Sequence, residues 1–256
     1  MCILFIAIQQ HPDYPLIVAA NRDEFHRRPS QQAHVWLSDE SIIAGKDLQQ
    51  GGTWLGVNQR GQFAALTNIR DTSAHRDEAL SRGNLVVNAL TNRLNRASLN
   101  ANYMNYNPFN LVFSEQDTLW YFHSQSAQFS RLEPGFHAIC NGKMDDVWPK
   151  MAHGEQALEA LINAAKQRAM VPDSEQLFTL LTNKQQAPEH LLPNTGVGLQ
   201  LEKMLSSIFI TSDDYGTRSS CVLLRDKYSK VRFYERTYNR QGAVVGEQQF
   251  VTHGQH

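Results

Sequence analysis

The sequence predicts an α+β domain in which two antiparallel sheets carry helices on their outer faces. Apolar runs of strand length come first, amphipathic helical patterns follow, and further strand-like runs close the chain. This order lacks the regular strand–helix alternation that is typical of a parallel sheet. No internal repeat, low-complexity tract or Gly/Ser-rich linker divides the chain, so residues 1–256 are expected to form a single domain.

The first strand is expected to begin almost at the start of the sequence. Residues 2–8 are an unbroken apolar run, and the turn signal at 11–15 separates it from a second apolar run at 16–20. Two such runs around a tight turn predict a hairpin that is buried on both faces. Residues 25–40 are expected to form a loop.

A second hairpin is expected further along the chain. Residues 42–44 lead into the glycine-rich segment 51–57, and a turn at 58–61 returns the chain into a strand at 63–68. The glycine of this turn is expected to adopt a positive φ.

Three helices are expected in the remainder. One runs from an N-cap at Ser81 to Leu94, one begins near Pro149 and reaches Ala169, and one begins after an N-cap at Asp173. Short strands are expected at 109–114, 119–123, 129–132, 136–141, 208–211, 219–224, 231–238 and 243–251.

Composition narrows the class of function. The net charge is −1, which gives no reason to expect nucleic acid or an anionic membrane as a partner. No apolar run approaches the roughly 18–20 residues of a transmembrane helix, and the N-terminus lacks the features of a signal peptide. Three widely spaced cysteines favour a reducing, cytoplasmic location. The histidines form no metal-binding motif, so neither a metal nor a cofactor is expected.

Cys2 is the leading candidate for a reactive centre. A small residue after Met1 permits removal of the initiator, which would place a thiol and a free α-amine on one residue. The ordinary pKa of the amine is about 7.7–8.0 and that of the thiol about 8.5, so the amine can accept the proton of the thiol. The alternative is that Cys2 is simply a small core residue.

Polar residues at strand ends are further candidates. The cluster 21–24 ends a strand antiparallel to the first, so Asp23 could orient the amine and Arg22 could favour the thiolate. The alternative is a solvated ion pair. Asn68 ends another strand and is either an oxyanion donor or a turn residue. Asn141 is by itself a turn signal, and Arg218 by itself a surface charge.

Together these segments resemble the NRDE family, also called the transport and Golgi organisation protein two family. The motifs that carry the resemblance lie at 1–2, 19–24, 28–29, 44–47, 51–56, 65–68, 81–83 and, more thinly, 215–219.

A more remote similarity is to N-terminal-nucleophile hydrolases of the bile-salt hydrolase and penicillin V acylase type. It implies a four-layer αββα fold with a processed N-terminal cysteine at Cys2. It also implies catalytic roles for Asp23, Asn68, Asn141 and Arg218. The acylases carry an arginine where this chain has Ala20. Arg22 is the expected substitute, with a side chain that starts from the opposite face of the strand.

The function expected from these features is hydrolysis of a linear, non-peptide amide through Cys2. Asn21, Trp54 and Phe63 are the expected substrate-binding residues. The alternative, implied by the family resemblance, is a non-catalytic binding or trafficking protein for haem or an acyl lipid. In that case Trp36, Trp54 and Phe63 would line an apolar pocket, and Cys2 or a histidine would ligate the haem iron.

Overall fold

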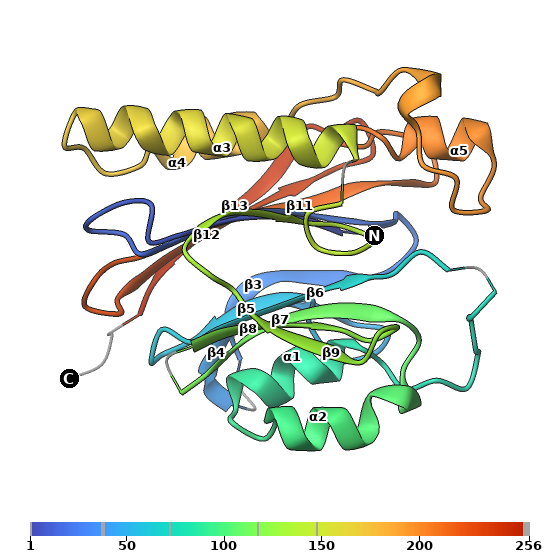
Figure 1. Cartoon of the computed structure of the whole chain (residues 1–256), viewed down its shortest axis with the longest axis horizontal. Helices are drawn as coiled ribbons and strands as arrows, with labels where there is room; N and C mark the ends of the chain where they lie inside the picture. Colours follow the sequence, from blue (N-terminus) through green and yellow to red (C-terminus); the bar gives the residue numbers. More distant parts are fainter. Residues whose placement is uncertain (1, 37–38, 72, 117, 147, 253–256) are drawn as a thin grey trace.

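A computed structural model describes residues 2–36, 39–71, 73–116, 118–146 and 148–252, and it shows a four-layer αββα sandwich (Figure 1). The first sheet has the strand order β10 (Gly135–Ile139), β1 (Cys2–Ile8), β2 (Leu16–Phe25), β11 (Tyr215–Arg225), β12 (Val231–Tyr238) and β13 (Val244–Val251). The second has the order β3 (Ser30–Trp36), β4 (Asp39–Asp47), β5 (Leu55–Asn58), β6 (Phe63–Asn68), β7 (Phe109–Glu115), β8 (Thr118–His123) and β9 (Gln128–Arg131). All strand pairs in both sheets are antiparallel.

Helices form the two outer layers. The helices α3 (Pro149–Gln167) and α4 (Ser174–Leu181) cover the first sheet, and α5 (Leu199–Met204) lies in the same layer. The helix α1 (Gly83–Leu90) packs on the second sheet, with α2 (Arg96–Asn102) beside it. The expected fold class is confirmed.

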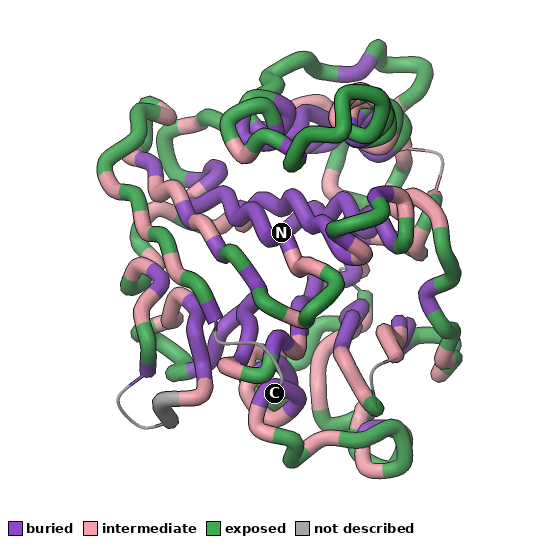
Figure 2. Tube along the Cα trace, turned by 90° about the vertical axis from the view of Figure 1, so that its left-hand side faces the viewer, coloured by how far each residue is buried: buried purple, intermediate pink, exposed green. Residues whose placement is uncertain are grey.

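Strand alternation explains why β1 is buried along its whole length (Figure 2). Cys2, Leu4 and their even-numbered neighbours face the core between the two sheets. Ile3, Phe5 and Ala7 face the core under α3 and α4. Successive side chains of a strand point to opposite faces, so a run buried on both faces must be apolar throughout.

The expected loop at 25–40 is wrong. The strand β2 continues to Phe25, and the hairpin of β3 and β4 occupies much of the segment, while residues 37–38 lie outside the described part. The strand β3 lies at the edge of its sheet, and only Ala33 and Trp36 are buried in it. An edge strand with so few buried positions has no apolar run, which is the pattern from which strands were predicted.

Several helix and strand predictions also need correction. The N-cap of α1 is Arg82 rather than Ser81, and the helix ends at Leu90, before the left-handed Asn92. The short helices α2 and α5 were not predicted. The segment 208–211 is not a strand. The N–H of Phe209 bonds to the carbonyl of Asn183 in a loop, and the pairing with β11 is limited to an isolated bridge between Thr211 and Gly216.

Other boundaries agree with the sequence. The helix α3 begins at Pro149, and Asp173 caps α4 with its side chain. The turn between β5 and β6 has its glycine, Gly61, at φ +77°. Across the described part of the chain, every helix is too short or too polar to cross a bilayer.

Candidate active site

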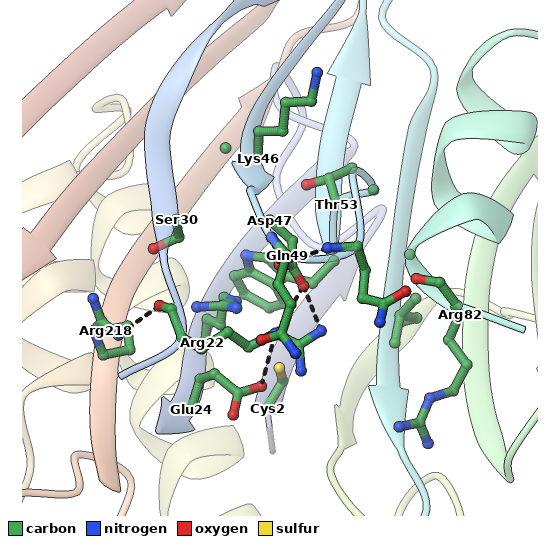
Figure 3. A pocket seen from close by; sticks show the side chains of 18 of the residues that line it. Cys2, Arg22, Glu24, Ser30, Lys46, Asp47, Gln49, Thr53, Arg82 and Arg218 are labelled. Atoms are coloured by element: carbon green, nitrogen blue, oxygen red, sulfur yellow. Dashed lines mark hydrogen bonds and ion pairs between the residues drawn. The ribbon is translucent and has the colours of Figure 1, made fainter. Parts of the chain in front are cut away.

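A cleft of about 620 Å³ opens between the two sheets at the start of β1 (Figure 3). Its walls come from β1, β2, β11 and β12 of the first sheet and from β3, β4, β6 and the segment before α1. Six of the residues singled out in the sequence line it, namely Cys2, Arg22, Asp23, Trp54, Asn68 and Arg218.

One row of paired residues crosses the floor of this cleft. Strand register places Cys2 opposite Arg22, Arg22 opposite Ser219, and Ser219 opposite Thr237. Residues paired directly across an antiparallel ladder share a face of the sheet. These four side chains therefore stand side by side at the cleft, with Arg22 next to the thiol.

The position of Arg22 corrects one expectation. The next pair along β1 and β2 is Leu4 with Ala20, and both belong to the core between the sheets. Residues 20 and 22 are two apart and share a face, so Arg22 starts from the same face as Ala20 and Cys2.

The Cys2 side chain is 8% exposed. Burial raises the pKa of its thiol to about 11, against the lowering effect of the charge on Arg22 and of the Asp23 backbone N–H. In a chain that retains Met1, a thiol with a pKa of about 11 is ionised in only about one molecule in ten thousand at pH 7. A nucleophilic Cys2 consequently needs a base beside it.

Asp23 follows Arg22 and is buried. Its Oδ1 accepts a hydrogen bond of 2.7 Å from the Thr217 hydroxyl, and its carbonyl accepts one of 3.0 Å from the Tyr215 hydroxyl. Burial raises the pKa of the Asp23 carboxyl, whereas the charge of Lys150 in α3 lowers it. The carboxylate is thus held in place from β11 at the point where β1 begins.

Asn68 reaches the cleft from the opposite sheet, at the end of β6. Within the described chain its side-chain amide has no hydrogen-bond partner, so its N–H donors are available to a ligand. Asn141 does not line the cleft. Its Nδ2 donates to the Asn68 carbonyl at 2.9 Å, and its Oδ1 accepts from the Cys140 thiol, which makes it a support for the end of β6.

Arg218 lies at a β-bulge. The register of β11 against β2 shifts between Thr217, which pairs with Asp23, and Ser219, which pairs with Arg22. The guanidinium of the extra residue donates to the carbonyls of Phe25, His26 and Arg28 at 3.0–3.2 Å. Arg218 therefore fastens the turn after β2 to β11.

Two expected substrate-binding residues lie elsewhere. Asn21 faces the helices, where its Nδ2 donates to the carbonyls of Leu181 and Ile208 at 2.8 and 2.9 Å. Phe63 is 1% exposed in the core between the sheets and does not line the cleft. Trp36 faces the helix side of the second sheet, so the expected apolar pocket of three aromatic residues does not form.

Two residues that were not expected from the sequence, Arg82 and Glu235, also line the cleft. Arg82 precedes α1, its Nη1 donates to the Pro108 carbonyl at 3.0 Å, and it is close enough to Cys2 for their charges to interact. Glu235 is buried on β12, where its Oε1 accepts from the Ala33 N–H at 2.6 Å. The motif at 81–83 signalled Arg82, and the alternation of β12, which places Glu235 on the face of Val231 and Phe233, was the signal for Glu235.

A contact between two glycines explains why the motifs at 51–56 and 81–83 occur together. A Cβ on Gly52 would lie 2.5 Å from the backbone carbon of Gly83, closer than atoms can pack. Only glycine permits this approach, which brings the Trp54 and Arg82 segments together at the cleft.

The family model for Transport and Golgi organisation 2 matches residues 1–240. The chain belongs to this family. It is 32% identical over 261 residues to the cattle (Bos taurus) Transport and Golgi organization protein 2 homolog, covering 93% of each chain. It is 30% identical to the Drosophila melanogaster protein, covering 93% of this chain and 92% of that one.

Among solved structures, the fold resembles that of a mutant conjugated bile acid hydrolase from Clostridium perfringens. The TM-score is 0.52 at 10% sequence identity, with 98% of this chain and 96% of that chain covered. This likeness shows that the chain has the fold of the N-terminal-nucleophile hydrolases.

Proposed function

We propose that this protein is an N-terminal-nucleophile amidohydrolase that cleaves a linear, non-peptide amide through Cys2. The observation that carries the proposal is that three groups meet at one cleft. They are the thiol of Cys2 at the start of β1, the buried carboxyl of Asp23 and the free side-chain amide of Asn68. The fold shared with a conjugated bile acid hydrolase supports the same class of reaction.

Removal of Met1 would supply the missing base. The new α-amine, with an ordinary pKa of about 7.7–8.0, would take the thiol proton as Sγ attacks the amide carbonyl carbon. Asn68 would donate to the oxyanion, and Asp23 would hold the ammonium. The proton then passes to the leaving nitrogen as the C–N bond breaks. Water hydrolyses the resulting thioester, which releases the acid and regenerates the thiol.

Intact mass spectrometry tests this directly. The purified protein is expected to lack Met1 and to gain one acyl group from an activated-ester probe, and Cys2→Ala is expected to gain none. Cys140→Ala is the matched control, because Cys140 is fully buried and lies outside the cleft. Retained Met1, or equal labelling of Cys2→Ala, would contradict the proposal.

Asn68→Ala tests the oxyanion role. Loss of one such donor typically slows the chemical step by about 10²–10³-fold. We therefore expect acylation of Cys2 to slow by about that factor with little change in melting temperature. Asn88→Ala, an amide of α1 outside the cleft, is the control and is expected to react at the wild-type rate. An unchanged rate in Asn68→Ala would remove Asn68 from the mechanism.

The raised pKa of the Cys2 thiol disfavours its action as a nucleophile, so a second candidate is a non-catalytic binding protein for an acyl lipid or haem; haem ligation by Cys2 would require its thiolate. If Met1 is retained, the thiol stays protonated and unreactive at pH 7. A haem titration followed by absorption, with wild type and Cys2→Ser, separates the candidates. A spectral shift that Cys2→Ser abolishes would support haem ligation by this thiol.

A further inference from the structure

Two arginines near Cys2 at the cleft, Arg22 and Arg82, form no ion pair with a carboxylate within the described residues. Within the described residues, no hydrogen bond or ion pair engages the Arg22 guanidinium. Arg82 makes a single side-chain bond, to the Pro108 carbonyl. By contrast, Arg28 pairs with Asp47 at 2.6 Å.

The acidic side chains deep in the cleft are already engaged. Asp23 accepts from Thr217, Glu235 accepts from the Ala33 N–H, and Asp47 pairs with Arg28. None of them forms an ion pair with Arg22 or Arg82, although Arg22 is close enough to Asp23 and Glu235 to lower the pKa of both carboxyls. The cleft therefore holds two guanidinium groups near the thiol that have no carboxylate bonded to them.

The two arginines lie on different walls of the cleft, on either side of Cys2 (Figure 3). Arg22 is its neighbour across the β1–β2 ladder, and Arg82 comes from the segment that precedes α1 below the second sheet. Both side chains are half-buried, and burial lowers the pKa of Arg82, as expected for a charge that has lost water without gaining a counter-ion.

A guanidinium has five N–H donors in a planar fork that matches the two oxygens of a carboxylate or phosphate. Leaving such donors without partners costs free energy, which a bound anion would recover. We infer that the cleft selects an amide that carries an anionic group, held between Arg22 and Arg82 beside the scissile carbonyl. This inference rests on the proposed function for its substrate class, but the anion site itself is testable without turnover.

Alkylation of Cys2 by iodoacetate and iodoacetamide provides that test. The two reagents undergo the same displacement of iodide by the thiolate and differ chiefly in charge. Their rate ratio at Cys2, measured by peptide mass mapping at one alkaline pH and fixed ionic strength, is divided by the ratio for free N-acetylcysteine. Any change in the thiol pKa affects both reagents alike and cancels.

The normalised ratio is expected to be about tenfold in favour of iodoacetate, and to fall by about threefold or more in Arg22→Gln and Arg82→Gln. Arg22→Lys, which keeps the charge, should retain part of the preference. Arg93→Gln is the matched control, because this exposed arginine lies outside the cleft. Melting curves establish that each variant is folded.

Acetate and inorganic phosphate, each added against iodoacetamide, distinguish the two kinds of anion by which one protects Cys2. A normalised ratio near one, or a ratio unchanged in both glutamine variants, would overturn the inference. Loss of the anion preference together with intact acyl transfer would refute this inference alone. Anion preference without acyl transfer would refute the proposed hydrolysis alone.

Discussion

Glu235 is a buried carboxyl group that stays protonated to a higher pH than an exposed glutamate does. It lies 4% exposed between the sheets, and burial raises its pKa from 4.5 to about 7, although the Ala33 N–H and the charge on Arg22 act in the opposite direction. The folded chain therefore keeps this proton at pH values where the unfolded chain has released it. Its contribution to stability is full below pH 4.5 and is lost as the pH rises through about 7.

Glu235→Gln should remove this pH dependence. Between the ordinary pKa of 4.5 and the raised value of about 7, we expect the wild type to lose about 3 kcal/mol more unfolding free energy than the variant. Urea unfolding at a series of pH values measures the difference. Glu78→Gln, at an exposed position, should follow the wild type. Parallel curves for wild type and Glu235→Gln would show that Glu235 is ionised throughout.

Single residues were predictable where a local pattern marked them. Cys2, Arg22, Asp23, Asn68 and Arg218 carry a motif or end a strand, and all reach the cleft. Alternation in β12 puts Glu235 on the same face as the buried Val231 and Phe233, but only the strand order of the sheet shows that this face reaches the cleft. The prediction that Asn21 binds substrate was wrong, because strand alternation turns its side chain toward the helices while that of its neighbour Arg22 faces the cleft.

The contact between α3 and β1 depends on one helical glycine. A Cβ on Gly154 would lie 2.0 Å from the ring of Phe5, which is fully buried. Glycine weakens a helix by about 1 kcal/mol relative to alanine, so an interior glycine needs a packing reason. Here that reason is the close approach of the helix to the strand that begins with Cys2.

Gly154→Ala should therefore destabilise the protein despite its better helix propensity. Overpacking typically costs about 1–3 kcal/mol, and the gain in propensity recovers up to about 1 kcal/mol. A net loss of about 1–2 kcal/mol is expected in denaturant unfolding. Gln156→Ala, on the exposed face of the same helix, should change stability by less than about 0.5 kcal/mol. A stabilised Gly154→Ala would show that Phe5 can move aside.

Elements with strong periodicity were predicted well, and elements fixed by tertiary contacts were not. The strand β12 has the predicted bounds, and α3 begins at the predicted proline. The strand β3 carries few apolar residues, and its place is fixed by pairing with β4 and by the hydrogen bond from the Ala33 N–H to Glu235 of the other sheet. No pattern within residues 30–36 records that partner.

At the scale of the whole molecule, the two sheets share one core. The apolar cluster between them includes Leu4 and Val18 from the first sheet and Leu55 and Val57 from the second. Neither sheet can bury this face without the other. We therefore propose that residues 1–256 fold as a single domain.

Thermal unfolding should accordingly be one cooperative transition. The calorimetric and van't Hoff enthalpies are expected to agree, and far- and near-ultraviolet circular dichroism should give the same midpoint. Reversibility is checked by a second scan. Two separated transitions, or an enthalpy ratio well above one, would mean that the layers unfold as separate units.

The extra residue of the β-bulge, Arg218, reverses the alternation of side chains between the two faces of β11. Thr217 and Ser219 are two apart and would share a face in a regular strand, yet Thr217 bonds to Asp23 while Ser219 stands beside Arg22 in the row at the cleft. One strand thus both bonds the Asp23 carboxylate through Thr217 and completes the row of side chains at the cleft through Ser219. Chain length here is as constrained as residue type, because losing one residue would exchange the two sides.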